Sequence, residues 1–421
     1  MKLKSTRSHL SYCTNIHAGE QWSELFPLLQ EHVPKVKQQV CPDAEFGLGL
    51  RASMSSIKAL QHPEALEHFR QWLSDEGVYV FTVNGFPYGA FHGTKVKADV
   101  YRPDWSEPHR LEYTCAIADV LAKLSPPDNF GSISTVPGTF RDWASDNKRQ
   151  DIVDNLLRCV AHCLKLEQQT GVTIAIALEP EPACLLETVD DVLTFFQDNL
   201  YSPAAVQALA TLSGTSTNDA RNALHTHLGV CYDICHAAVE FEDPLVGIQR
   251  MQQAGIPIIK LQLSSALRLP NVDSRSLASL ERFNEPVYLH QVVEKKKKQL
   301  TRFHDLPLAI KAHQKAHQLE SQHNSSQSNV TSDTANNQSK EWRVHFHVPV
   351  FLDTLEHFGT TQQQLADVLK AHAHNPIAPH LEVETYTWDV LPEHYRQVDV
   401  SQAIARELNW VSDTLQDTGK V

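Results

Sequence analysis

The sequence predicts an α/β fold, an eight-stranded β/α barrel with insertions. Short apolar or β-branched runs alternate with longer helix-like segments, which is typical of βα units that build a parallel sheet. Several runs are apolar almost throughout, as expected of strands that are covered on both faces. Some of the runs end in acidic or imidazole side chains, and the carboxyl ends of barrel strands share one rim.

Nine segments qualify as strands, one more than an eight-stranded barrel needs. One of them must therefore be an extension, a hairpin arm or a misassignment. We expect the extra segment to be one of the pair 256–263 and 343–350. The candidate strands are 10–16, 46–51, 78–83, 131–136, 172–178, 228–234, 256–263, 343–350 and 380–386.

Amphipathic stretches between the strands predict the outer helices. Residues 149–169 are the clearest case, because Ile152, Leu156, Val160 and Leu164 recur at helical spacing and define one apolar side. Such a stripe would pack a helix against the outside of the barrel.

We expect residues 1–421 to form a single barrel domain with two insertions. The first, 201–224, is Ala-rich and predicted to be helical. The second spans 284–342, in which 292–322 is charged and helix-prone, with four lysines in succession. Residues 323–340 are rich in Ser, Asn, Gln and Thr. A segment with so few large apolar side chains cannot offset its ordering entropy, so a disordered loop is predicted there.

Composition limits the class of partner. The 421 residues carry a formal net charge of −13, which repels nucleic acid and anionic membranes, so neither is an expected partner. The first residues carry positive charge without the apolar segment of a signal peptide, and no apolar run reaches the roughly 18 residues of a membrane span. The 8 cysteines contain no CxxC pair and are expected to be reduced, mostly buried thiols. A cytoplasmic location is expected.

Acidic side chains end two of the apolar runs. Glu179 and Glu181 share one strand face by the period of two, and so do Glu382 and Glu384. A carboxylate buried at a strand end is costly unless it is paired or bound to a cation. One such acid alone is more often solvated or paired with arginine, but recurrence at equivalent strand ends favours a shared site. Glu179 directly follows its apolar run, and Glu384 lies nearer the rim than Glu382, so these two are the predicted metal ligands.

Imidazoles join this pattern on two further segments. Asp233 ends an apolar run and His236 follows three residues later, so both can face the same mouth and bind one metal or two neighbouring ones. His345 and His347 alternate with a phenylalanine on one predicted strand. A lone histidine is more often structural, yet the neighbouring acids favour metal ligation. Asp233, His236, His345 and His347 are therefore predicted metal ligands.

The remaining strand ends are polar as well. His17, Arg51 and Asn84 follow or end early strands, and together with Glu181 they are the predicted substrate-binding residues. Segment 84–93 is rich in glycine and aromatic residues, which predicts a shaped substrate loop or lid, although an ordinary surface loop explains it equally well.

Three cations follow this loop. Lys95, Lys97 and Arg102 could neutralise a phosphate or a carboxylate of the substrate, or could be ordinary flanking charges. The sequence contains no GxSxG, no P-loop and no GxGxxG after a predicted strand.

The order of these ligands resembles the xylose isomerase-like TIM (β/α)8 barrel superfamily, which includes sugar isomerases, ketose epimerases and endonuclease IV-type DNA repair enzymes. The residues that carry the resemblance are Glu179, Asp233 with His236, an imidazole from His345 or His347, and Glu384. The resemblance implies a divalent metal (Zn, Mn, Fe or Co) in the barrel mouth. Gln262 departs from the pattern, because many members carry a histidine ligand there. If 256–263 is the seventh barrel strand, His345 and His347 come from an added arm.

A closer resemblance covers nearly the whole chain and points to the EboE-type metabolite traffic proteins. It implies an operon shared with a UbiA-like prenyltransferase, hence a membrane-bound partner, and a role in moving or maturing a small metabolite precursor. The segments that carry it are 10–17 (LSYCTNIH), 46–51 (FGLGLR), 81–89 (FTVNGFPYG), 131–138 (GSISTVPG), 178–182 (LEPEP), 345–350 (HFHVPV) and 381–388 (LEVETYTW).

Three functions follow as hypotheses. In the first, the protein has isomerase- or epimerase-like chemistry, with Glu179 and Glu384 as catalytic carboxylates and Glu181, Arg51 and Asn84 orienting a hydroxy-carbonyl substrate. In the second, it binds a metabolite at the metal without turnover and passes it to a partner. The third is an endonuclease IV-like phosphodiesterase, against which the net charge and the lack of a basic, aromatic-interleaved stripe both argue.

Overall fold

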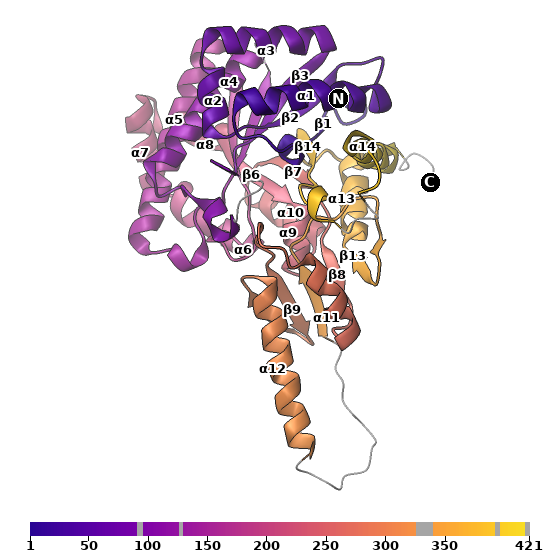
Figure 1. Cartoon of the computed structure of the whole chain (residues 1–421). Helices are drawn as coiled ribbons and strands as arrows, with labels where there is room; N and C mark the ends of the chain where they lie inside the picture. Colours follow the sequence, from indigo (N-terminus) through magenta and orange to yellow (C-terminus); the bar gives the residue numbers. More distant parts are fainter. Residues whose placement is uncertain (91–95, 126–128, 326–339, 392–395, 417–421) are drawn as a thin grey trace.

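In the computed structural model, which describes residues 1–90, 96–125, 129–325, 340–391 and 396–416, eight parallel strands form a nearly closed barrel (Figure 1). The bridge between Cys13 and Gly49 joins its two ends, confirming the predicted barrel. In their order around the sheet the strands are β1 (His9–Tyr12), β14 (His380–Val383), β7 (Ile258–Leu263), β6 (Leu228–Asp233), β5 (Thr173–Leu178), β4 (Phe130–Thr135), β3 (Val78–Asn84) and β2 (Phe46–Arg51).

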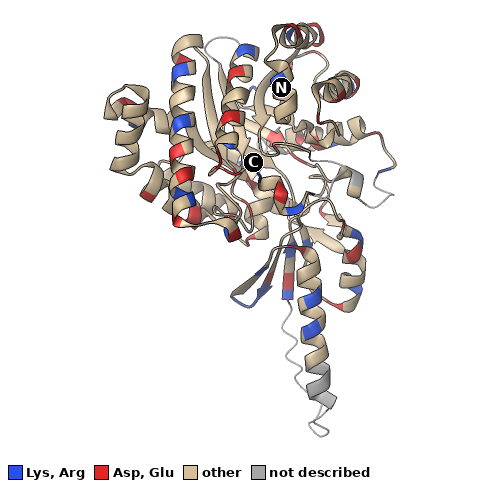
Figure 2. Ribbon diagram, turned by 60° about the vertical axis from the view of Figure 1, so that its left-hand side comes forward, with Lys and Arg blue, Asp and Glu red and all other residues tan. Residues whose placement is uncertain are grey.

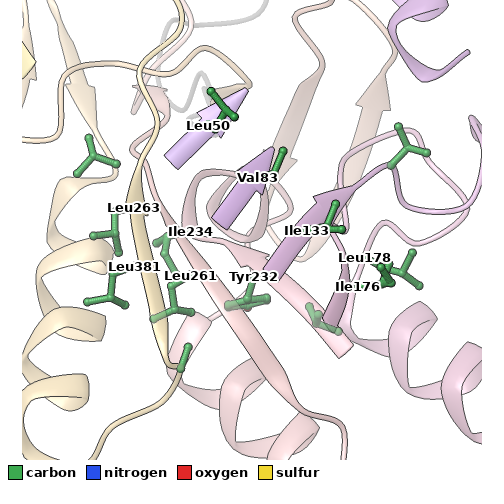
Figure 3. Close-up of a cluster of buried hydrophobic side chains, with 14 of the residues drawn as sticks. Leu50, Val83, Ile133, Ile176, Leu178, Tyr232, Ile234, Leu261, Leu263 and Leu381 are labelled. Atoms are coloured by element: carbon green, nitrogen blue, oxygen red, sulfur yellow. The ribbon is translucent and has the colours of Figure 1, made fainter. Parts of the chain in front are cut away.

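Side chains alternate between the two faces of the barrel wall. Lys260 on β7 donates a 3.2 Å hydrogen bond to Ser134 Oγ on β4, a strand that is not its neighbour, so both side chains lie inside the barrel. The alternate positions, such as Ile133 and Leu261, therefore face outward, in the apolar layer shown in Figure 3. The interior of this barrel is consequently polar, and the main apolar core lies between strands and helices.

Helices surround the barrel. The predicted helix 149–169 is confirmed in α5, which begins after the N-cap Ser145 and ends at Gly171 in the left-handed region (φ 73°). Residues 201–224 contain α7 and most of α8. The helices are α1 (Trp22–Val40), α2 (Met54–Leu60), α3 (Pro63–Glu76), α4 (Pro108–Leu124), α5 (Asp146–Thr170), α6 (Val189–Phe195), α7 (Pro203–Ser213), α8 (Thr217–His227), α9 (Ile234–Val239), α10 (Pro244–Gln253), α11 (Ser274–Leu280), α12 (Leu306–Ser325), α13 (Gln362–His374) and α14 (Val400–Gln416).

A second, six-stranded sheet is inserted between β7 and β14, and its described strands pair antiparallel throughout. The surplus candidate strand 343–350 belongs here: only residues up to Val344 are in a strand, and the eighth barrel strand is β14. In their order across this sheet the strands are β10 (Gln299–Phe303), β9 (Val292–Lys296), β11 (Lys340–Val344), β8 (Leu267–Leu269), β13 (Phe358–Thr360) and β12 (Thr354–Leu355).

The prediction of helix throughout 292–322 is wrong for its first third. Residues 292–303 form the hairpin of β9 and β10, with Lys297 in the left-handed region (φ 57°) at its turn. Val292 and Val293 are buried, so packing against the inserted sheet overrides the helical propensity of the lysines. The predicted disordered loop 323–340 lies mostly in 326–339, outside the described residues.

The inserted sheet carries a helix away from the barrel. Helix α12 points away from the barrel (Figure 1), and Lys and Arg residues lie along it and the neighbouring hairpin (Figure 2). Across the described ranges, no helix combines the length and apolar character that crossing a membrane requires.

Helix α14 contributes a buried acid with a pH-dependent effect on stability. Glu407 Oε1 accepts hydrogen bonds from Thr385 Oγ1 (2.7 Å) and from the Val350 N–H (3.0 Å). Burial nevertheless raises the pKa of Glu407 to about 7. The folded state therefore holds this proton more tightly than the unfolded state does. The stability that the proton confers is present near pH 4.5 and is lost as the pH rises towards 7.

We expect Glu407→Gln to stabilise the protein at pH 8 by about 1–3 kcal/mol, and to leave its stability at pH 4.5 nearly unchanged. The amide keeps an acceptor oxygen but has no charge to bury. Urea unfolding of both proteins across pH 4.5–8 measures the difference. Glu112→Gln, on the exposed face of α4, is the control. Parallel wild-type and Glu407→Gln profiles would contradict the assignment.

Candidate metal centre

The three acids at the strand ends converge at the carboxyl rim of the barrel. Glu179 follows β5, Asp233 ends β6, and Glu384 follows β14. One oxygen from each lies within 4.8 Å of the other two, and all three side chains are buried. We call these residues the carboxylate cluster.

Burial of three acids together changes their proton affinity. Desolvation, reinforced by Glu384 and Asp233, raises the pKa of Glu179 well above its ordinary value. Desolvation and then Asp233 do the same for Glu384. Glu179 Oε2 and Asp233 Oδ2 are buried and accept no hydrogen bond from any described residue. Buried oxygens without donors are unfavourable as they stand, and a cation at this position would compensate both.

The other oxygens of the cluster are held in place by neighbours. Asn15 Nδ2 and Asn84 Nδ2 donate to Glu384 Oε1 at 2.8 and 2.9 Å. Asp233 is also the N-cap of α9: its Oδ1 accepts from the His236 N–H (3.0 Å) and from Ser264 Oγ (2.6 Å). The cap fixes Asp233 Oδ1, so that Oδ2 is left facing the imidazoles.

Three histidines meet beside these acids. His345 Nε2 is 3.1 Å from His236 Nε2 and 3.3 Å from His347 Nε2. We call His236, His345 and His347 the imidazole cluster. Asp233 Oδ2 lies 3.7 Å from His236 Nε2 and 3.8 Å from His347 Nε2, so the two clusters adjoin at Asp233.

Backbone acceptors define which ring nitrogens carry protons. The Nδ1 of His236 lies 2.8 Å from the carbonyl oxygen of Pro180, and that of His347 lies 2.8 Å from the carbonyl oxygen of Glu384. A carbonyl only accepts, so each Nδ1 donates and each Nε2 presents a lone pair to the cluster. Burial lowers the pKa of His345 well below its ordinary value and that of His347 to about 4, so both rings are neutral near pH 7.

These residues fit a divalent cation. Neutral imidazoles whose lone pairs converge repel one another unless a proton or metal lies between them. Ligands bound at 2.0–2.1 Å to a tetrahedral metal are about 3.3 Å apart, which is close to the spacing of these nitrogens. Buried oxygens and neutral imidazoles in one place form the ligand set of Zn, Mn, Fe and Co sites.

The inserted sheet supplies part of the site. His345 and His347 follow β11, and Gln291, just before β9, places its Oε1 2.6 Å from His345 Nδ1. Gln291 Nε2 also donates to Glu181 Oε1 at 3.3 Å, where Tyr101 OH donates at 2.7 Å. Glu181 is thereby positioned beside the imidazole cluster rather than within the carboxylate cluster.

Strand β7, which lies between β6 and β14, carries two further buried polar side chains, Lys260 and Gln262. Gln262 lies on β7 in register with Asp233 and Glu382, and both polar atoms of its side chain are buried without a partner among the described residues. Two residues earlier, Lys260 Nζ forms a fully buried ion pair with Glu382 Oε1 at 2.6 Å. The structure therefore separates Glu382, an interior ion-pair partner, from Glu384, a member of the site.

Two predicted substrate-binding residues have other partners. His17 hydrogen-bonds Tyr12 through Nε2 (3.0 Å) and stacks on His32. Arg51 pairs with Glu20 and donates to the carbonyl oxygen of Gly89 (2.6 Å). Neither lines the pocket above the metal centre, whereas Asn84 and Glu181 do.

Sequence reasoning missed three participants. Gln291 and Tyr101 lie in segments without a strand-end pattern, and nothing in the sequence points to them. Lys260 did carry a signal, because a lysine inside the apolar run 256–263 must either pair or disrupt the strand.

Comparisons with known proteins identify the fold. No family model and no curated protein matches the chain. A xylose isomerase-like TIM barrel protein from Mycobacterium smegmatis, solved in complex with magnesium, aligns with a TM-score of 0.51 at 8% identity and 99% coverage of both chains. An L-ribulose 3-epimerase aligns with a TM-score of 0.47 at 10% identity, covering 98% of this chain and 95% of the epimerase. The IOLI protein, solved with zinc, gives 0.46 at 9%, covering 98% and 100%.

The alignment with the Mycobacterium smegmatis protein spans the barrel and the inserted sheet together. The eight parallel strands with surrounding helices agree with it. The chain is an α/β protein with the xylose isomerase-like TIM barrel fold.

Proposed function

We propose that this protein acts on a small hydroxy-carbonyl metabolite at a divalent-metal centre, with isomerase- or epimerase-like chemistry. One observation carries the proposal: the carboxylate and imidazole clusters adjoin, buried, at the barrel rim where catalytic sites of this architecture lie. Glu179, Asp233, Glu384, His236, His345 and His347 would hold the metal. The magnesium of the Mycobacterium smegmatis protein is consistent with a divalent ion in this fold.

The carboxylates have distinct roles in such a reaction. When bound, a divalent cation would polarise a substrate carbonyl and stabilise the negative charge that develops on its oxygen. No described residue donates a hydrogen bond to Glu179 Oε2, so the Glu179 carboxylate, besides holding the metal, would accept a proton from the carbon beside the carbonyl. Glu384 is restrained by Asn15 and Asn84 and returns a proton from another direction. Glu181 and Asn84 orient the substrate.

The metabolite traffic role is a finer proposal. The segments quoted above for the EboE-type resemblance support it, and in that role the protein would carry or mature a precursor for a membrane-bound prenyltransferase. Gln262 favours the non-catalytic version, because a histidine ligand of many superfamily members is replaced there. Tight metabolite binding without turnover would distinguish the carrier from the enzyme.

Metal analysis of Asp233→Asn tests the centre. We expect protein purified without chelator or affinity nickel to contain bound Zn, Mn, Fe or Co by mass spectrometry, and the variant to lose at least about tenfold in metal affinity. Asp243→Asn is the matched control, because Asp243 caps α10 as Asp233 caps α9 but lies outside both clusters. Asparagine still caps a helix, and circular dichroism checks the fold.

Two results would contradict the proposal. One is wild-type protein that takes up none of the four metals on titration. The other is Asp233→Asn protein that binds metal as tightly as wild type and the Asp243→Asn control.

A further inference from the structure

The pocket above the metal centre has a polar floor and apolar walls. The floor consists of Glu179, Glu384 and the imidazole cluster, with Asn15, Asn84 and Glu181. The walls are mainly Phe86, Pro87, Val96, Val100, Tyr288 and Leu289. The carboxylates, imidazoles and amides of the lining all belong to the floor, so a ligand would meet these groups at the metal and mainly apolar surface along the walls.

The segments that form the walls are joined by backbone hydrogen bonds. The backbone N–H groups of Val96 and Lys97 both donate to the carbonyl oxygen of Val287, at 3.0 and 2.9 Å. The chain leading into the 3-10 turn η2 (Lys97–Tyr101) is thereby joined to the inserted segment that carries Tyr288. The Tyr288 ring meets that of Tyr386 edge-on at 5.0 Å. The apolar wall is therefore a built surface of the described chain.

The described part of the walls has one lysine, and that lysine is paired. Among the lining residues that the structure describes, Lys97 is the only lysine or arginine. Its Nζ is 2.8 Å from Asp305 Oδ2 and 3.3 Å from the carbonyl oxygen of Glu285. Arg102 pairs with Asp99 and lies over the Trp143 ring. Lys95 lies outside the described residues. Among the described residues, a phosphate or carboxylate on the ligand would thus face the carboxylate cluster without a free lysine or arginine.

The donor groups of the floor already form hydrogen bonds within the site. Asn15 and Asn84 both donate to Glu384, and Tyr101 OH donates to Glu181. A polyhydroxylated chain extending away from the metal would leave its hydroxyl groups against aromatic and aliphatic carbon, at the cost of their hydrogen bonds to water. An apolar ring in the same place would gain by burial.

From this distribution we propose that the substrate is an uncharged compound with two neighbouring oxygens at one end and an apolar ring or chain at the other. The oxygens face the metal, and the apolar part lies against Phe86, Val100 and Tyr288. This assignment rests on the proposed metal-dependent function and adds its substrate class. It separates this chain from enzymes whose substrates are free or phosphorylated sugars.

Two matched probes test the assignment. Hydroxyacetone and 2-hydroxy-1-phenylethanone share an α-hydroxy ketone and differ by a methyl against a phenyl group. Calorimetry on metal-loaded protein, with metal content measured on the same sample, should give at least about tenfold tighter binding of the phenyl compound. Phe86→Ala should reduce that ratio, and Phe351→Ala, which alters an aromatic residue outside the pocket, should not.

Three other results would contradict the proposed substrate class or its position in the pocket. Equal affinity for the two ketones, or tighter binding of D-fructose than of the phenyl compound, overturns the substrate class and leaves the metal centre intact. Failure of both ketones to bind metal-loaded protein overturns the substrate class and the proposed chemistry together. A ratio unchanged in Phe86→Ala shows that the ring does not lie against this wall.

Discussion

Lys260→Met is expected to destabilise the folded protein by about 3–5 kcal/mol, because it leaves a buried carboxylate without its partner. Lys260 and Glu382 are both fully buried, and Lys260 Nζ lies 2.6 Å from Glu382 Oε1. Burial alone would lower the pKa of Lys260, but Glu382 together with Cys231 and Cys13 outweighs burial and raises that pKa above its ordinary value. The lysine therefore stays charged inside the barrel, and Glu382 depends on it.

The double variant Lys260→Met/Glu382→Gln is the control for this prediction. Removing both charges removes the unpaired ion, so most of the lost stability should return. Denaturant unfolding of the wild type, both single variants and the double variant gives the coupling energy between the two side chains. A double variant as unstable as Lys260→Met would show that the pair contributes through packing rather than through charge.

The same cycle reports on the metal centre. Lys260 lies below the carboxylate cluster, and its charge lowers the pKa values of Glu179 and Glu384, against the larger effect of burial. Without it, protons compete more strongly with a metal for these oxygens. Metal affinity at pH 7 should fall in Lys260→Met and return in the double variant, in which the net charge of the interior is restored.

The barrel was predictable from the sequence because parallel strands that are buried on both faces consist almost entirely of apolar residues. The strand ends followed in turn: once β5, β6 and β14 run parallel, Glu179, Asp233 and Glu384 must reach the same rim. This part of the site needs only the period of two and the direction of the strands.

The contribution of the inserted sheet to the metal centre was harder to predict from the sequence. β11 pairs with β8 and β9, which precede it by more than 40 residues. No local pattern in 292–303 indicates that pairing. The hairpin there forms because Val292 and Val293 gain burial that a helix would not give them. Gln291 reaches His345 only through this long-range packing, so its role could not be inferred from neighbouring residues.

The polar interior escaped prediction for a different reason. Lys260 and Glu382 each stand in an otherwise apolar run, and each alone suggests a strand edge or a rim position. Only the closed barrel shows that β7 and β14 are neighbours, with His380 beside Lys260 and Glu382 beside Gln262 in register. An ion pair between residues 122 positions apart depends on this order of strands in the sheet, which no local pattern specifies.

Gly49→Ala is expected to destabilise the protein by about 3 kcal/mol or more, because the space at this position is already filled. A Cβ there would lie 1.8 Å from Glu382 Oε2 and 2.8 Å from the carbonyl oxygen of Tyr12. Glu382 cannot move aside without leaving Lys260. The Tyr12 carbonyl belongs to the backbone at the seam, where Gly49 N–H also bonds Ser11 Oγ at 2.8 Å.

Gly359→Ala is the matched control, since Gly359 also lies in a strand and a Cβ there would meet only the carbonyl oxygen of Arg268, at 3.8 Å. Its unfolding free energy should stay within about 1 kcal/mol of wild type. Comparable losses in the two variants would mean that a methyl group in any strand disturbs this sheet. A loss confined to Gly49→Ala would show that the seam between β1 and β2 closes only because glycine leaves room for Glu382. The ion pair below the metal centre would then be tied to the closure of the barrel itself.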